Sequence, residues 1–235
     1  MKRFEDKEGS EYELFLKVSP YYGNLQKTIA KEVRKVRPKS ALEIGFGSGH
    51  TTAAVIKANP SLKITAVDSS QVMVKQAKES LCKQISAKKV KLVFEDALVF
   101  LRKCKNNQFD VFYSGLTLHN IEKGKRKLIL QQIYRVLKEE GLFVNGDKYA
   151  RDSPKDQKRE LDWQIKKFNI FEKLGRADLK KIWKEHYLID ENSYLIMKET
   201  KSKKEMKSLG FESIKVVFRK HMEAVLIAKK ALENI

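Results

Sequence analysis

Residues 41–52 read ALEIGFGSGHTT, a short apolar run that leads into three glycines at alternate positions. The run from Ser40 to Gly45 predicts a buried strand, and the residues from Thr51 to Ala58 predict a helix. Glycines at such a junction let the backbone turn sharply and approach a ligand, to which the helix N-terminus offers free N–H groups. A tight turn without a ligand has the same pattern, so its meaning depends on the rest of the chain.

The alternation of strand and helix continues on the C-terminal side of this turn. Further apolar runs predict strands at 63–68, 90–95, 109–114 and 141–147. Helical spacing of apolar residues predicts helices between them at 70–80, 97–104 and 123–137. Alternating strands and helices with short connections predict a parallel sheet that is covered by helices on both faces. The fold class is therefore α/β.

The end of the chain departs from this alternation. Residues 151 to about 191 are charged and helical, and a further helix is predicted near 203–209. The runs 211–218 and 223–229 are too close for a crossover helix, so they predict an antiparallel hairpin. We interpret the chain as one domain, 1–235, made of an N-terminal lid and helix (1–39), a cofactor-binding core (40–148), a helical insert (149–200) and a final helix with the hairpin (201–235).

Acidic residues follow the second and third predicted strands. Asp68 ends the run 63–68, and Asp96 follows Glu95 at the end of the next run. A carboxylate at the first position can accept both ribose hydroxyls of an adenosine, and one at the second can accept the exocyclic amine of adenine. Either residue could instead cap the helix that follows it. The turn has His50 where the nicotinamide fingerprint has its third glycine, so we expect no binding of nicotinamide dinucleotides.

These features together resemble the class I S-adenosylmethionine-dependent methyltransferases. The matching stretches are ALEIGFGSGHTT, ITAVDSSQVMVKQAK, LVFEDAL, FDVFYSGLTLHNI and RVLKEEGLFVNGD, and the hairpin region 203–229 matches more loosely. The resemblance implies S-adenosylmethionine as the cofactor. It also implies a seven-stranded Rossmann-like sheet, mostly parallel with a terminal antiparallel hairpin, with helices on both faces and a helical lid insert.

The resemblance further implies which residues bind the cofactor. Gly45, Gly47 and Gly49 would line its methionine part, and Glu43 would help to hold its amino group through the loop. Asp68 would bind the ribose, Asp96 with Ala97 the adenine, and Ser114 and Gly115 would face the sulfonium. Ser69 and Tyr22 complete the predicted cofactor site. Tyr22, with Tyr21, either closes over the methionine part as a lid or buries its ring against the sheet.

The flanks are similar to a subgroup, the bacterial tRNA wobble-uridine carboxymethyltransferases, which use a carboxylated S-adenosylmethionine. The similarity rests on SPYYGNL at 19–25 and on the insert at 163–188. That subgroup holds the extra carboxylate with an arginine early in the insert, where this chain has Lys166 and Lys167. Either a lysine replaces that arginine or the cofactor lacks the carboxylate.

His119 is the candidate catalytic residue, because its loop follows the fourth strand and is expected to face the cofactor cleft. It would act as a general base toward an O-methyl acceptor, or it would only pack the loop. Glu122 is the carboxylate that could orient its ring, and Asp147 is expected at the same rim or as a cap. The aromatic residues of the insert form either a core or a substrate pocket.

Composition bounds the partners. The chain carries 49 Lys and Arg against 30 Asp and Glu, and the basic residues are spread over nearly every helix. This favours a solvated lysine-rich surface over an RNA footprint, which remains the alternative. We find no apolar stretch for a membrane span, no signal peptide and no metal-ligand spacing around the two cysteines, so we expect a cytoplasmic monomer or homodimer without a metal.

The sequence therefore predicts a methyltransferase that uses S-adenosylmethionine to methylate an unidentified acceptor, a small molecule in our interpretation. The first alternative is a tRNA-modifying methyl- or carboxymethyltransferase. The second is a catalytically silent protein that binds the cofactor or RNA.

Overall fold

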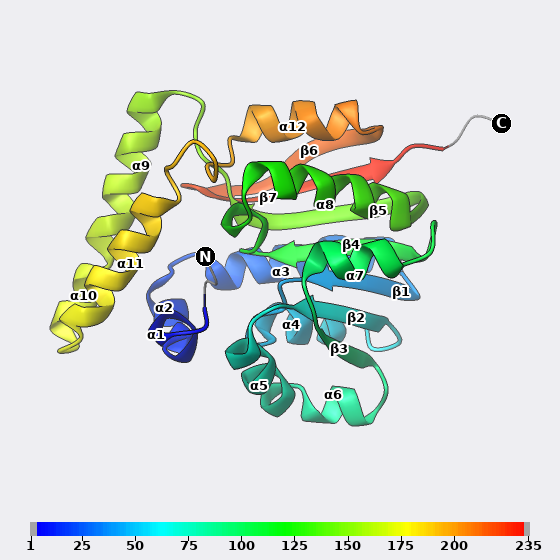
Figure 1. The fold of residues 1–235 in the computed structure, drawn as a ribbon, viewed down its shortest axis with the longest axis horizontal. Coiled ribbons are helices and arrows are strands. Elements are labelled where there is room, and N and C mark those ends of the chain that lie inside the picture. Colours follow the sequence, from blue (N-terminus) through cyan, green and yellow to red (C-terminus); the bar gives the residue numbers. More distant parts are fainter. Residues whose placement is uncertain (1–3, 233–235) are drawn as a thin grey trace.

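The computed structural model describes residues 4–232, and within them the chain forms a seven-stranded sheet of order β3-β2-β1-β4-β5-β7-β6 (Figure 1). The strands are β1 (Ser40–Ile44), β2 (Lys63–Asp68), β3 (Val90–Phe94), β4 (Phe109–Gly115), β5 (Leu137–Lys148), β6 (Phe211–Lys220) and β7 (Glu223–Lys230). Strands β1 to β5 pair in parallel, whereas β7 pairs antiparallel with both β5 and β6. The predicted fold class is confirmed.

Helices cover both faces of the sheet. One face carries α3 (Tyr22–Lys35), α4 (His50–Ala58) and α5 (Gln71–Ser80), and the other carries α7 (Ala97–Lys103), α8 (Lys123–Val136) and α12 (Glu199–Ser208). Neighbouring strand residues alternate between the two cores, since Val111 and Tyr113 pack with the first group and Phe112 with the second. Two short helical elements, α6 (Cys82–Ser86) and η1 (Leu118–Asn120), lie in the connections after α5 and β4.

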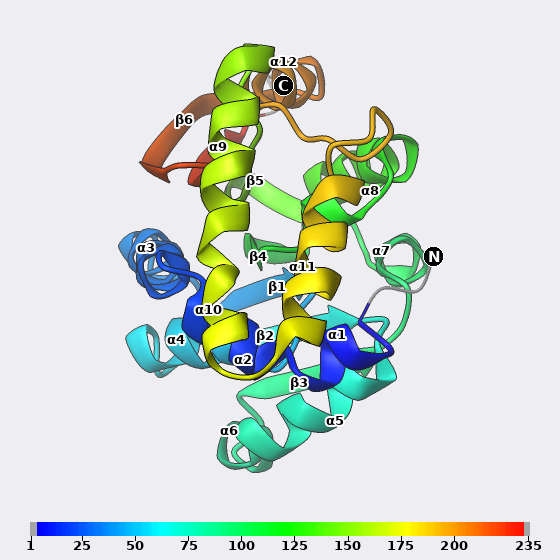
Figure 2. The same ribbon diagram turned by 90° about the vertical axis from the view of Figure 1, so that its left-hand side faces the viewer.

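A third apolar core lies outside the sheet. It joins α2 (Tyr12–Val18), which follows α1 (Lys7–Ser10), to the insert, which consists of α9 (Pro154–Lys167), α10 (Asn169–Lys173) and α11 (Ala177–Ile189). The rings of Phe15 and Trp183 stack with centroids 3.9 Å apart, and Phe168 is fully buried beside them. These helices stand across the end of the sheet at which the parallel strands finish (Figure 2). Most of the aromatic stripe of the insert is therefore core.

The structure corrects several predicted boundaries. Strand β5 begins at Leu137, where the sequence predicts the end of a helix, and it runs on to Lys148. Leu137 pairs with Phe109 of β4, so an extended strand begins there although its next three residues are exposed. That exposed stretch, Lys-Glu-Glu at 138–140, conceals the strand in the sequence. Helix α12 likewise begins at Glu199 instead of Lys203.

Candidate functional site

A cavity of about 580 Å³ opens at the ends of β1, β2, β3 and β4. The strand order reverses between β1 and β4, and ligands of open parallel sheets bind at such a reversal. Its walls come from the loops after these four strands, and the N-terminal side adds Phe4 and Glu5 from before α1, Tyr12 from α2 and Tyr22 from α3. The arrangement matches the place at which the sequence predicts the cofactor.

The three glycines of the first loop have left-handed backbone conformations, with φ of 72° at Gly45, 54° at Gly47 and 93° at Gly49. A Cβ at Gly45 would lie 2.1 Å from Cγ2 of Thr117, so this glycine permits a close approach of two loops. A Cβ at Gly47 would meet nothing within 4 Å. Gly45 and Gly47 line the cavity, whereas Gly49 packs toward Leu81 instead of toward the predicted methionine position.

Asp68 braces the glycine loop. Its Oδ2 accepts a hydrogen bond from the Gly47 backbone N–H at 2.9 Å, and its Oδ1 accepts one from Ser70 N–H at 2.9 Å. Burial raises the pKa of Asp68, and these backbone N–H groups oppose that rise. The carboxylate and the neighbouring Ser69 both line the cavity. The aspartate is thus placed to bind a ligand while it holds the loop that would bind the same ligand.

Asp96 and Ala97 also line the cavity. Oδ1 of Asp96 accepts from the backbone N–H of Leu98 at 3.0 Å, so this aspartate caps α7 as the alternative interpretation predicts. Its Oδ2 accepts from Nζ of Lys125 at 2.6 Å. Burial alone would raise the pKa of Asp96, but the hydrogen bond from Lys125 and the backbone donors hold it below its usual value.

Glu43 and Ser114 lie behind the cavity and do not line it. Glu43 is fully buried, and its Oε2 accepts hydrogen bonds from Oγ1 of Thr52 at 2.6 Å and from the Tyr113 hydroxyl at 2.8 Å. Burial raises the pKa of Glu43 to about 7. The Ser114 hydroxyl donates to the Ile44 carbonyl at 3.0 Å, which turns it away from the predicted sulfonium position. Gly115, in contrast, lines the cavity.

The N-terminal segment supplies cavity residues that the sequence does not single out. The Phe4 carbonyl accepts from the Ser70 hydroxyl at 2.9 Å, and a Glu5 carboxylate oxygen accepts from the Gln71 N–H at 3.0 Å. Tyr22 lines the cavity as predicted, and burial raises the pKa of its hydroxyl well above the usual value. Tyr21 instead stacks on Trp163, with ring centroids 6.1 Å apart.

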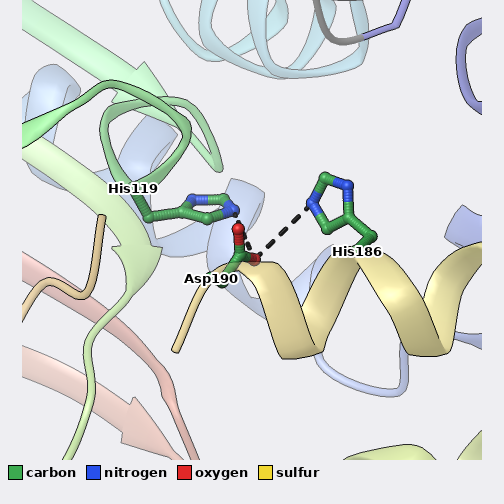
Figure 3. A group of neighbouring side chains, drawn as sticks. All are labelled: His119, His186 and Asp190. Atoms are coloured by element: carbon green, nitrogen blue, oxygen red, sulfur yellow. Dashed lines mark ion pairs between the residues drawn. The ribbon is translucent and has the colours of Figure 1, made fainter. Parts of the chain in front are cut away.

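His119 does not have the position that the sequence predicts. Its neighbours Thr117 and Asn120 line the large cavity, whereas His119 is buried, with Nδ1 2.5 Å from Oδ1 of Asp147. Figure 3 shows its ring directed toward Asp190, whose Oδ2 lies 3.8 Å from Nε2. Glu122, the predicted orienting residue, lines the large cavity instead. The general-base role stays a prediction, and its expected geometry is corrected.

Lys166 and Lys167 stand in the segment where the carboxymethyltransferase subgroup has its arginine, and the structure shows where they lie. Lys166 and Lys167 are exposed and do not line the large cavity. The Lys167 ammonium lies 4.7 Å above the ring of Trp163. Among the described residues, Lys125 is the only basic residue that lines the cavity.

Comparisons with known proteins agree with this geometry. Residues 41–141 match the model of a methyltransferase-domain family. Among solved structures, an O-methyltransferase family protein from Burkholderia thailandensis has a TM-score of 0.72 at 12% identity, over 97% of this chain and 62% of that one. A putative S-adenosylmethionine-dependent methyltransferase from Methanococcus maripaludis has a TM-score of 0.65 at 16% identity, over 100% and 97%. This chain thus spans less than two thirds of the first of these proteins.

Residues 41–141 therefore match a methyltransferase domain, and the chain has the fold of S-adenosylmethionine-dependent methyltransferases. Among curated proteins, the chain is similar to the carboxy-S-adenosyl-L-methionine synthase of Nautilia profundicola, with 25% identity over 97% of this chain and 94% of that protein. The synthase of the same name from Campylobacter fetus is 26% identical over 90% and 86%. No helix within residues 4–232 is long and apolar enough to cross a membrane.

Proposed function

We propose that this protein transfers the methyl group of S-adenosylmethionine to a small-molecule acceptor in the large cavity. The observation that carries the proposal is the joint presence of the glycine loop, Asp68 and Asp96 at three successive strand ends around one cavity. Methyl transfer from a sulfonium is an in-line displacement, so the protein mainly positions the acceptor and excludes water.

The roles follow the order of the strands. Adenine would bind beside Asp96 and Ala97, and the ribose beside Asp68 and Ser69. The methionine part would lie along Gly45 and Gly47 under Tyr22, with the sulfonium near Gly115. Glu43, Gly49 and Ser114 would act indirectly, because they support the loops instead of lining the cavity.

The charge of the cavity favours a neutral or cationic acceptor. Glu5, Asp68, Glu95, Asp96 and Glu122 all line it. The ammonium of Lys125 is engaged by Asp96 at 2.6 Å. A cationic cofactor is stabilised in such surroundings, and an anionic acceptor is disfavoured by like charge. An amine acceptor that loses its proton after transfer needs no general base, and we propose that His119 supports its loop.

The second candidate is chemistry with a carboxylated S-adenosylmethionine. It is favoured by relatives named carboxy-S-adenosyl-L-methionine synthase, which match 90% or more of this chain in several cases. That name describes formation of carboxy-S-adenosylmethionine and not modification of tRNA. It therefore agrees only partly with the alternative of a tRNA-modifying methyl- or carboxymethyltransferase. A carboxylated cofactor would place an additional anion among the cavity carboxylates.

The test begins with the purified protein. Calorimetry should detect binding of S-adenosylmethionine and S-adenosylhomocysteine, and no binding of NAD. Mass spectrometry of any co-purified nucleoside then separates the two candidates, because the carboxylated cofactor is heavier by the mass of carbon dioxide. NAD binding without binding of either S-adenosyl ligand would refute the proposal.

Turnover measurements distinguish a small-molecule acceptor from a tRNA acceptor. S-adenosylhomocysteine formation is followed with a panel of small amines and alcohols, and separately with bulk tRNA. Formation only with tRNA, together with binding that weakens steeply as salt rises, would assign the protein to RNA modification. Binding of the cofactor without turnover on any acceptor would favour the silent alternative.

A further inference from the structure

A second cluster of reactive side chains lies where the insert meets the loop after β4. His119 of η1, His186 of α11 and Asp190 just after α11 are all buried, and each offers one ligand atom within 4.8 Å of the others (Figure 3). Oδ2 of Asp190 lies 3.8 Å from Nε2 of His119 and 3.6 Å from Nε2 of His186. We propose that this cluster binds one first-row divalent transition-metal ion.

The other nitrogen of each histidine ring faces a carboxylate. Nδ1 of His119 lies 2.5 Å from Oδ1 of Asp147, and Nδ1 of His186 lies 3.4 Å from Oε1 of Glu8. A carboxylate accepts hydrogen bonds, so with Nδ1 as the donor each ring would present the lone pair of Nε2 to a metal ion. Carboxylates that fix the far nitrogen of a histidine in this way are typical of metal-ligating histidines.

The donor set and its spacing suit such an ion. Two imidazole nitrogens and one carboxylate oxygen are ligands of Zn²⁺, Fe²⁺ and Co²⁺. Bonds of about 2.1 Å at a tetrahedral centre separate two ligand atoms by about 3.4 Å, so the two histidine–aspartate separations of 3.8 and 3.6 Å need to shrink by only a few tenths of an ångström, and the two histidine nitrogens, which lie within 4.8 Å of each other, need to approach as the ion binds. A small cavity of about 10 Å³ borders His119 and Asp190, which is close to the space that one water ligand needs.

Lys148 competes with the ion for Asp190. Its Nζ forms an ion pair with Oδ2 of Asp190 and lies 3.8 Å from the centre of the Tyr187 ring. The same oxygen, Oδ2, lies nearest to both histidines, so the lysine and a metal ion would compete for it. The ammonium also weakens the attraction of Asp190 for a cation. Removing this charge should therefore raise the affinity for the metal ion. If the ion pair has only a structural role, its removal should leave that affinity unchanged.

The proposed ion would join three parts of the chain around the large cavity. His119 belongs to the loop after β4, His186 and Asp190 belong to the insert, and Glu8 belongs to α1. Binding would therefore hold the insert, α1 and the loop after β4 together. This inference goes beyond the proposed methyl transfer and does not depend on it.

The experiment uses the full chain after dialysis against EDTA. ZnCl₂ is titrated by calorimetry and CoCl₂ by visible absorption, and one equivalent should bind with an absorption typical of low-symmetry Co²⁺. His186→Ala and Asp190→Asn should abolish saturable binding. Glu8→Gln should weaken it by about tenfold or more, because it removes only the supporting carboxylate. His221→Ala is the matched control and should bind like the wild type, since His221 lies outside the cluster and contacts Glu160.

Two results would overturn the proposal. One is a folded wild-type protein that shows no saturable binding of either Zn²⁺ or Co²⁺. The other is binding that persists unchanged in folded His186→Ala. Where the ligand variants do not fold, Glu8→Gln and Lys148→Met decide, because the proposal requires weaker binding in the first and stronger binding in the second. Unchanged affinity in both would reject the site.

Discussion

Replacing Asp68 with alanine tests the centre of the proposed cofactor site. The substitution removes two backbone hydrogen bonds of 2.9 Å each, from Gly47 and Ser70, and with them the brace of the glycine loop. Hydrogen bonds to a charged group contribute about 1.5–3 kcal/mol each. Burial of the carboxylate offsets part of this, so we expect a loss of stability near the lower end, about 3 kcal/mol in total.

Cofactor affinity should fall as well. If Asp68 also accepts two ribose hydroxyls, each lost bond costs at least about 1.5 kcal/mol, and 1.4 kcal/mol corresponds to one decade of affinity. We therefore expect S-adenosylhomocysteine to bind at least about tenfold more weakly to Asp68→Ala. Calorimetry measures the affinity, and urea unfolding of the same preparation measures the stability.

Asp110 provides a matched control. Its Oδ2 accepts from the backbone N–H groups of Lys39 and Ser40 at 2.9 and 2.8 Å, but it lies at the opposite end of the sheet from the cavity. Asp110→Ala should lose stability in the same way and keep its cofactor affinity. A folded Asp68→Ala protein with unchanged cofactor affinity would show that Asp68 only stabilises the glycine loop. An equal loss of affinity in both variants would refute the ribose contact.

Three further predictions concern the same region. Because burial raises the pKa of Glu43 from about 4.5 to about 7, its contribution to stability is present below about pH 4.5 and is lost as pH rises through 7. Urea unfolding should show a loss of about 3 kcal/mol over that range that is absent in Glu43→Gln. Gly47→Ala should cost only about 1–2 kcal/mol of stability but impair cofactor binding by calorimetry, whereas Gly45→Ala should also lose stability through its contact with Thr117. His119→Ala should lower the unfolding midpoint and leave turnover nearly unchanged, and a loss of turnover beyond about 100-fold with intact binding would restore the general base.

The sequence predicts most of the sheet because its parallel strands are short and largely apolar. β1, β2, β3 and β4 begin at the predicted residues, since most of their apolar side chains pack into the cores on the two faces of the sheet. The first residues of β5 escape prediction because Lys138 and Glu140 are exposed and polar. Helix α2 is not predicted because its apolar residues pack on the insert, more than 140 residues further along the chain, and the four residues of α1 have no apolar side chain.

In the candidate site, too, the sequence predicts the positions of some residues and not of others. The positions of Asp68, the last residue of β2, and Asp96, two residues after β3, can be predicted from the sequence because each strand fixes where its end lies. The contact between His119 and Asp147 depends on the pairing of β4 with β5, so neighbours in sequence gave Glu122 as the orienting residue instead. Gly49 lies in the loop after β1 and Ser114 near the end of β4, as expected, but Gly49 packs toward Leu81 and the Ser114 hydroxyl points to the Ile44 carbonyl.

We expect the choice of acceptor to depend on the helices that stand across this end of the sheet and not on the glycine loop. These helices are α1, α2 and the insert, and α2 shares with the insert an aromatic core around Trp183, which also includes Met222 of the turn between β6 and β7. The ion pairs across it, such as Arg176 with Glu11 at 2.9 Å, are partly exposed and add little stability. The segment before α1 also hydrogen-bonds to Ser70 and Gln71, so substitutions there would reach the cofactor site. A TM-score of 0.72 at 12% identity shows a shared fold, and a shared fold does not transfer an acceptor from one protein to another.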